Sequence, residues 1–303
     1  MDQSELVVDA EVLRRFDRPG PRYTSYPTAD RFVEAFDAAA YQRALEAHRA
    51  SGRPRGLSLY VHLPFCSTIC YYCACNKVIT KDRGRAAKYV RYLGRELELV
   101  GELLGADERV GQLHWGGGTP TVLAHDELRA LMEKIRSRFP LADDGEYSIE
   151  VDPRSAGPET IALLASLGFN RLSVNVQDFD EDVQRTVNRR QSLEETATVI
   201  EAARAHGFRS VNLDLIYGLP RQDSARMERT LTKVLRLAPD RIALYNYAHL
   251  PATFKPQRRI AESELPSAAA RIDLAVLAMR SLTEAGYGYI GMDHFALPHD
   301  ELV

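Results

Sequence analysis

Strand-like and helix-like runs alternate through most of this chain of 303 residues, and this alternation limits its fold more than any other feature. Runs typical of strands occupy residues 57–63, 110–115, 147–152, 171–177, 210–217 and 241–248. Segments with helical periodicity separate them, at residues 86–104, 126–139, 158–167, 193–206, 225–237 and 268–284. Six βα units in succession predict an α/β fold, in which helices cover a parallel sheet that forms an open or closed barrel.

The expected strands carry apolar and polar side chains in alternation. Within 210–217, Leu213 and Leu215 alternate with Asn212 and Asp214, so each pair shares one face of the strand. Three other expected strands have the same pattern. The apolar face must meet the helices, but a closed, packed barrel would also carry Val, Ile and Leu on its inner face. The pattern therefore predicts an open, partial (β/α)6 barrel with a polar interior that holds the active site.

The first 56 residues differ from the rest of the chain. We expect one amphipathic helix over residues 33–49, preceded by an extended arm that is rich in proline and glycine. The arm contains Arg14, Arg15, Arg18 and Arg22, a basic segment that could meet an anionic substrate. We therefore divide the chain into an N-terminal arm and helix (1–56) and a core with the start of a C-terminal extension (57–303).

Composition and charge exclude several classes of protein. Apolar residues make up 45% and charged residues 27% of the chain, which excludes a disordered polypeptide. A formal charge of −3 gives no electrostatic case for nucleic acid or an anionic membrane surface. No apolar run reaches the roughly 18 residues of a membrane span, and the N-terminus does not resemble a secretory signal. We expect a cytoplasmic protein.

All four cysteines lie within ten positions, at Cys66, Cys70, Cys73 and Cys75. A disulfide framework fits poorly, because such frameworks belong to small secreted domains. Structural zinc is an alternative, although four thiolates so close in sequence are awkward to arrange as a tetrahedron. An iron–sulfur cluster is the third interpretation, since Cys-x3-Cys-x2-Cys lets one short loop present three sulfurs to a cubane. The fourth iron would then be open to another ligand.

The segment from Tyr60 to Lys77 resembles the signature of the radical S-adenosylmethionine (SAM) superfamily, including the aromatic Tyr72 before the third cysteine. The resemblance implies an open barrel of the radical SAM type with the N-terminal arm added. It implies a [4Fe-4S] cluster held by Cys66, Cys70 and Cys73, with SAM chelating the fourth iron. Reduction of the cluster would cleave SAM to methionine and a 5′-deoxyadenosyl radical.

Further segments are similar to the oxygen-independent coproporphyrinogen III oxidase (dehydrogenase) family. They are residues 20–28, 66–76, 114–121, 245–251 and 291–296, and the resemblance runs from about residue 10 to the end. It implies oxidative decarboxylation of two propionates of an anionic porphyrinogen to vinyl groups, giving protoporphyrinogen IX in haem biosynthesis. The family also implies an electron donor, an electron acceptor and a monomer.

The same resemblance implies a set of SAM contacts and a second SAM beside the first. The matching positions are Tyr60, Tyr72, Gly117, Gly118, Thr119, Glu150, Gln177, Arg189, Asp214 and Ala248. Cys75 matches the family's fourth cysteine, which is not a cluster ligand. Family members continue into a largely helical C-terminal domain, so we expect this chain either to be a fragment or to have lost that domain.

Two alternatives to the decarboxylase remain. Haem-chaperone relatives share the core and the cluster motif, but they generally lack the arm at residues 22–27 and carry an aromatic residue at the position of Cys75. The other alternative is a zinc-stabilised α/β barrel of unknown activity. Tight haem binding, or one zinc and no iron after anaerobic purification, would respectively favour these alternatives.

Overall fold

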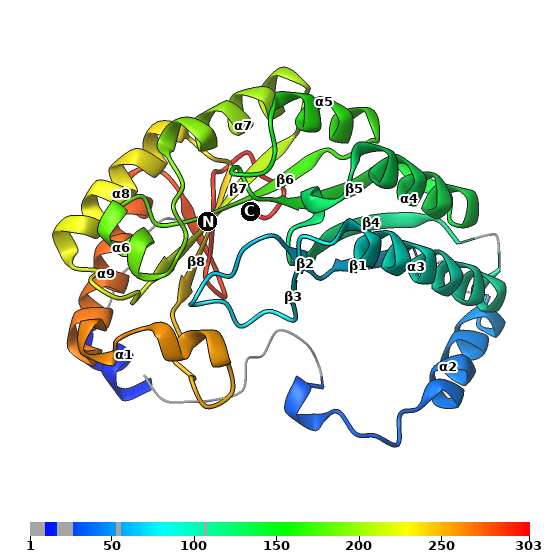
Figure 1. The fold of residues 1–303 in the computed structure, drawn as a ribbon, viewed down its shortest axis with the longest axis horizontal. Helices are drawn as coiled ribbons and strands as arrows, with labels where there is room; N and C mark the ends of the chain where they lie inside the picture. The colour runs from blue at the N-terminus through cyan, green and yellow to red at the C-terminus, as the bar shows by residue number, and fades with distance from the viewer. Residues whose placement is uncertain (1–9, 17–26, 53–55, 106–107) are drawn as a thin grey trace.

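A computed structural model describes residues 10–16, 27–52, 56–105 and 108–303, and it has a curved sheet at its centre (Figure 1). The strand order is β1-β4-β5-β6-β7-β8-β10-β9. Its parallel strands are β1 (Leu57–Leu63), β4 (Val110–Gly117), β5 (Leu141–Val151), β6 (Arg171–Gln177), β7 (Ser210–Tyr217) and β8 (Arg241–Asn246). An antiparallel hairpin of β9 (Gly288–Gly291) and β10 (His294–Ala296) extends the sheet beyond β8. In the described ranges no hydrogen bonds join β1 to β9, so the barrel is open as predicted.

Helices cover the outer, convex side of the sheet (Figure 1). They are α3 (Arg83–Leu104), α4 (His125–Arg138), α5 (Pro158–Ser166), α7 (Leu193–Ala205), α8 (Ser224–Leu237) and α9 (Ala268–Glu284). Shorter elements lie in the connections: α6 (Glu181–Thr186), η1 (Ala29–Arg31), η2 (Pro120–Val122), η3 (Lys255–Arg259) and η4 (Glu262–Glu264). The expected alternation of strands and helices is confirmed.

The sequence of α8 shows why these outer helices form. Asp223 caps its N-terminus by accepting a hydrogen bond from the backbone N–H of Arg226. Met227, Leu231 and Val234 recur at helical spacing and are buried in the core. The helix therefore has one apolar stripe that packs inward, and its other side faces water.

The core lies between these helices and the apolar faces of the strands. In β6, Leu172, Val174 and Val176 are almost fully buried. Ser173 and Asn175 alternate with them and remain partly exposed on the inner side of the sheet. The polar lumen predicted from the strand periodicity is thus present.

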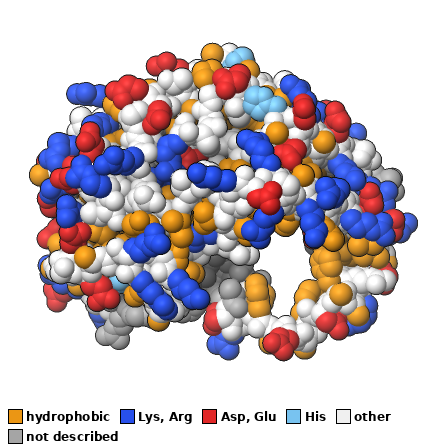
Figure 2. All heavy atoms as spheres, viewed as in Figure 1, with side chains coloured by type: hydrophobic (Ala, Val, Ile, Leu, Met, Phe, Trp, Pro, Cys, Tyr) orange, Lys and Arg blue, Asp and Glu red, His pale blue; other side chains and the backbone are white. Residues whose placement is uncertain are grey.

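The N-terminal region differs in part from the prediction. The helix expected at 33–49 is α2 (Ala38–Ala50), which packs on α3, and Asp37 caps its N-terminus. A short helix, α1 (Ala10–Phe16), carries the exposed Arg14 and Arg15 and packs on α9. Arg18, Arg22 and most of the arm at 20–28 lie outside the described residues. Figure 2 shows an opening between the segment that leads into α2 and the rest of the molecule.

Other differences are local. The strand expected at 241–248 ends at Asn246, because the chain turns away from the sheet to form η3 and η4. The hairpin of β9 and β10 was not predicted. No helix in the described part of the chain is long and apolar enough to cross a membrane.

Candidate cluster and cofactor site

The cysteine loop follows β1 and is closed on itself by a small two-stranded sheet. Strand β2 (Phe65–Cys66) pairs in parallel with β3 (Val78–Ile79), so residues 66–79 form a loop with adjoining ends. The side chain of Lys77 donates hydrogen bonds to the carbonyls of Cys73 (2.8 Å) and Cys75 (3.2 Å). These bonds fix the turn that carries the third and fourth cysteines.

Two other segments hold the loop from outside. The backbone N–H of Tyr71 donates to the carbonyl of Val187 (2.9 Å), which lies just after α6. The side chain of Gln257, fully buried in η3, donates to the carbonyl of Tyr72 (3.0 Å). The backbone around Cys70 and Cys73 is therefore tied to two segments far along the chain.

The cysteines open into a cavity of about 510 Å³ at the carboxyl ends of the strands. This is where α/β barrels place their ligand sites. Eleven of the predicted site residues line the cavity: Cys66, Cys70, Cys73, Tyr72, Gly117, Gly118, Thr119, Glu150, Gln177, Arg189 and Asp214. Cys75 lines it too. Residues from separate βα units thus meet in one polar site.

Tyr60 and Ala248 are the two predicted residues that do not line this cavity. Tyr60 is 60% exposed, and its ring stacks on His114 with ring centroids 5.8 Å apart. The carbonyl of Ala248 accepts a hydrogen bond from Gln257 (3.1 Å) beyond the end of β8. Their predicted contacts with SAM remain predictions.

Glycine is required at two positions beside the loop. Gly117 has φ of +117°, a conformation that favours glycine, and a Cβ there would lie 2.6 Å from the ring of His62. A Cβ on Gly118 would lie 2.7 Å from backbone atoms of Pro64 and Phe65. The end of β4 can therefore approach the cysteine loop closely only because it lacks side chains.

Hydrogen bonds and burial change the ionisation of the cysteines. Burial raises the pKa of the Cys66 thiol, and a hydrogen bond from the Thr119 hydroxyl (Oγ1 to Sγ, 3.6 Å) opposes that shift. A hydrogen bond from Cys75 lowers the pKa of Cys73 to about 6. The thiolate is the form that binds metal, so Cys73 is suited to be a ligand.

Asp214 lies on β7 and lines the same cavity as Glu150 of β5. It accepts hydrogen bonds from Asn212 (2.8 Å) and Ser173 (3.2 Å). Burial, with the nearby charge of Glu150, raises the pKa of Asp214 to about 6. The lumen therefore contains two carboxyl groups, one of which gains a proton in mildly acidic solution.

Two charged residues beside Cys70, Asp152 and Arg154, escaped prediction from the sequence. Asp152 is buried and forms ion pairs with Arg154 (2.6 Å) and with the buried Arg189 (3.1 Å). Burial alone would raise the pKa of Asp152, but these two guanidinium groups hold it below its usual value. The sequence Asp-Pro-Arg directly after β5 could have indicated this ion pair. An acidic and a basic residue so close in sequence are, however, usually an exposed pair that contributes little.

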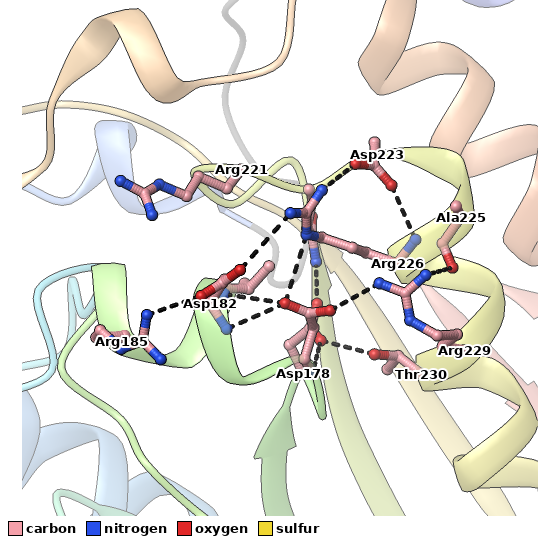
Figure 3. A network of polar contacts seen from close by, with 12 residues as sticks. Asp178, Asp182, Arg185, Arg221, Asp223, Ala225, Arg226, Arg229 and Thr230 are labelled. Atoms are coloured by element: carbon pink, nitrogen blue, oxygen red, sulfur yellow. Dashed lines mark hydrogen bonds and ion pairs between the residues drawn. The ribbon is translucent and has the colours of Figure 1, made fainter.

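The segment that carries Arg189 is anchored by a second network (Figure 3). Asp178 is almost fully buried after β6 and accepts hydrogen bonds from Thr230 and Gln222, both 2.6 Å long. Nearby, Arg226 of α8 forms ion pairs with Asp180 (3.5 Å) and Asp182 (3.7 Å). The network joins α6 to α8 and so fixes the start of the segment that leads to Arg189.

The donors present fit a thiolate-bound cluster and an anionic ligand. Three thiols from one loop line the cavity, with N–H and O–H groups directed at two of them. The Nε atom of Arg189 is buried and has no hydrogen-bond partner among the described residues, as a site for an anion would leave it. Within the same residues, no three His, Cys, Asp or Glu side chains are arranged to hold a single metal ion.

Comparisons with known proteins agree with this site. Residues 60–234, more than half of the chain, match the model of the radical SAM superfamily. The oxygen-independent coproporphyrinogen III oxidase of Pseudomonas aeruginosa is 55% identical over 296 residues, which are 97% of this chain and 64% of that protein. The Escherichia coli protein of the same name is 45% identical over 302 residues, 100% of this chain and 65% of its own length.

A solved structure resembles the whole described fold. Coproporphyrinogen III oxidase from Escherichia coli, reported as a radical SAM enzyme, superposes with a TM-score of 0.90 at 45% identity. The match covers 96% of this chain and 64% of that structure. The chain thus spans a little under two thirds of the length of the relatives it matches.

Proposed function

The chain belongs to the radical SAM superfamily, and from this premise we propose that it converts coproporphyrinogen III to protoporphyrinogen IX without oxygen, in haem biosynthesis. The reaction is the oxidative decarboxylation of two propionate side chains to vinyl groups. One observation carries the proposal. The three motif cysteines meet eight other predicted contact residues in one cavity, in a chain 45–55% identical to proteins named for this activity.

Membership of the superfamily indicates a [4Fe-4S] cluster and SAM as cofactors. When bound, they would supply a 5′-deoxyadenosyl radical for removal of a hydrogen atom from the β-carbon of a propionate. CO2 then leaves, and the remaining electron passes to an external acceptor. We propose Cys66, Cys70 and Cys73 as the cluster ligands. Thiolates suit iron. No fourth thiolate is needed in this proposal, because SAM chelates the fourth iron.

The cavity residues have distinct roles in this proposal. Arg189 binds the carboxylate of SAM, because it lines the cavity beside Cys70, its buried Nε lacks a partner in the described part of the chain, and charge-assisted hydrogen bonds to carboxylates are strong. Glu150 and Asp214 bind ribose hydroxyls, and Gly117 and Gly118 expose backbone to the methionine part. A second SAM beside the first, with the predicted contacts of Tyr60 and Ala248, belongs to the same proposal.

The remaining proposals concern partners and location. We propose that the chain uses an external one-electron donor and an electron acceptor. We also propose that it is a cytoplasmic monomer, with an N-terminal arm at 1–56 and a core at 57–303. A formal charge of −3 supports the absence of nucleic-acid and membrane partners. The exposed Arg14 and Arg15 of α1 support an anionic substrate.

The experiment supplies this chain anaerobically with iron, sulfide, reductant and SAM, and then with coproporphyrinogen III. Porphyrins with one and two vinyl groups are separated by chromatography, and the Cys70→Ala variant serves as the control. We expect vinyl products only from the unmodified chain. No vinyl product from a chain that holds a full cluster would contradict the decarboxylase, and tight haem binding by that chain would favour the haem-chaperone alternative.

A further inference from the structure

Two guanidinium groups converge on the sulfur of Cys70. The NH1 atom of Arg189 lies 3.8 Å and the NH2 atom of Arg154 lies 4.0 Å from the Sγ of Cys70. Arg189 comes from the segment after α6, whereas Arg154 comes from the turn after β5. Two separate elements thus deliver positive charge to one of the three proposed cluster ligands.

Asp152 organises both arginines. It accepts from Arg154 through both carboxylate oxygens, with Nε to Oδ1 at 2.9 Å and NH2 to Oδ2 at 2.6 Å. Its Oδ2 also accepts from NH1 of Arg189 at 3.1 Å. Asp152 and Arg189 are nine-tenths buried or more, and the side chain of Arg154 is 22% exposed. One carboxylate between two guanidinium groups leaves one net positive charge in a poorly solvated place beside Cys70.

Arg154 differs from Arg189 in what it can still bind. Its Nε and NH2 are already engaged by Asp152, so this guanidinium is held in place rather than free for a ligand. Arg189 keeps a buried Nε without a partner in the described ranges, which fits its proposed contact with SAM. Arg154 therefore provides a fixed positive charge and an N–H group near the sulfur of Cys70.

We propose that Arg154 is a positioning residue that raises the reduction potential of the cluster bound through Cys70. The inference rests on the proposed function, which places a cluster on that sulfur. Hydrogen bonds to cluster sulfurs and net charge near the cluster both set its potential. In the step concerned, one electron passes from an external one-electron reductant to the cluster, and no bond forms or breaks. A fixed cation favours the more negative, reduced state.

The test measures the reduction potential by redox titration with detection by electron paramagnetic resonance, and it requires no turnover. In Arg154→Gln we expect the ratio of reduced to oxidised cluster to fall about tenfold at a fixed potential, equivalent to about 59 mV for one electron. Arg154→Lys keeps the charge and should retain most of the potential. Arg190→Gln removes an exposed cation next to Arg189 that does not line the cavity, and it should leave the potential unchanged.

A second variant tests the direction in which charge beside Cys70 shifts the reduction potential. Asp152→Asn removes the negative charge between the two arginines, so the potential should rise, opposite to the effect of Arg154→Gln. A fully loaded Arg154→Gln protein with the potential of the unmodified chain would overturn the inference. Loss of the cluster in both Arg154→Gln and Arg154→Lys would also overturn it, because Arg154 would then be needed to assemble the site.

The unmodified chain separates this inference from the proposed function. If it takes up no [4Fe-4S] cluster, the proposed function itself fails. If it takes up the cluster and the potential does not respond to Arg154, only the inference fails.

Discussion

Asn188 donates a 2.7 Å hydrogen bond from its Nδ2 to the backbone carbonyl of Ile69, directly before Cys70. The residue just before it, Val187, accepts from the backbone N–H of Tyr71. Asn188 has φ of +54°, a left-handed conformation that asparagine tolerates better than most residues. The segment after α6 thus holds both sides of Cys70 through two adjacent residues.

Loss of the Asn188 amide should loosen this contact. Asn188→Asp keeps the size of the side chain and its tolerance of positive φ, but it places an acceptor against the Ile69 carbonyl. The bond is exposed, so water can replace it, and we expect the free energy of unfolding to fall by about 0.5–1.5 kcal/mol. Denaturant unfolding of the metal-free chain measures it. Asn188→Gly loses the bond without adding charge, but glycine also relieves the left-handed conformation, so this variant should lose less stability than Asn188→Asp. Unchanged stability in Asn188→Asp would refute the role of Asn188.

The four cysteines should separate into two classes. Replacing Cys66, Cys70 or Cys73 by alanine should abolish assembly of the cluster, because three thiolates leave no redundancy. Cys75→Ser should keep it. Iron and sulfide content with the visible absorption spectrum measures assembly. A full cubane spectrum in any of the three alanine variants would remove that residue from the ligand set, and its loss in Cys75→Ser would make Cys75 a ligand.

A side chain at Gly118 should displace the cysteine loop. A Cβ there would lie 2.7 Å from backbone atoms of Pro64 and Phe65, which cannot rotate away as a flexible side chain can. We expect Gly118→Ala to lower the free energy of unfolding by about 1–3 kcal/mol, as overpacking does. Gly111→Ala is the matched control in β4, since a Cβ there meets nothing within 4 Å. Equal stability of the two variants would contradict the close approach.

The stability of the chain should depend on pH through Asp214. Its folded pKa of about 6 lies above the ordinary value of roughly 3.9, so the native state binds more protons than the unfolded state between these values. The contribution of Asp214 to stability is therefore most favourable below about pH 4 and is lost as the pH rises through about 6.

The Asp214→Asn variant isolates this contribution. Its free energy of unfolding relative to the unmodified chain should rise by about 2 kcal/mol between pH 4 and pH 7, because each tenfold difference in proton affinity between the folded and unfolded states corresponds to about 1.4 kcal/mol. Urea unfolding of both chains at the two pH values measures the difference. A difference that does not change with pH would show that Asp214 titrates as an ordinary aspartate.

Much of the fold could be predicted because its strands are regular. Strands β1, β6 and β7 have the predicted bounds, since alternating side chains and flanking turn residues mark both ends. The hairpin of β9 and β10 escaped prediction because its strands are short and Tyr289 and Ile290, an apolar pair, are both exposed. Helix α6 has six residues, too few for a periodic signal.

The site shows the same division. Glu150 and Gln177 were predicted at strand ends, and both line the cavity. Arg154 was missed because its ion pair with Asp152 spans two residues in sequence. Only the fold brings Arg189 to that pair from 35 positions further along the chain. The contact of Asn188 with Ile69 joins residues 119 positions apart, and no local pattern reports it.

The most direct measurement is the yield of 5′-deoxyadenosine from this chain after anaerobic reconstitution, with reductant and SAM, with and without coproporphyrinogen III. We predict slow formation without substrate and clear stimulation when the porphyrinogen is added. A chain that carries a full cluster and forms no 5′-deoxyadenosine in either condition would contradict the radical SAM chemistry proposed for this site. Formation that does not respond to coproporphyrinogen III would contradict the assignment of that substrate.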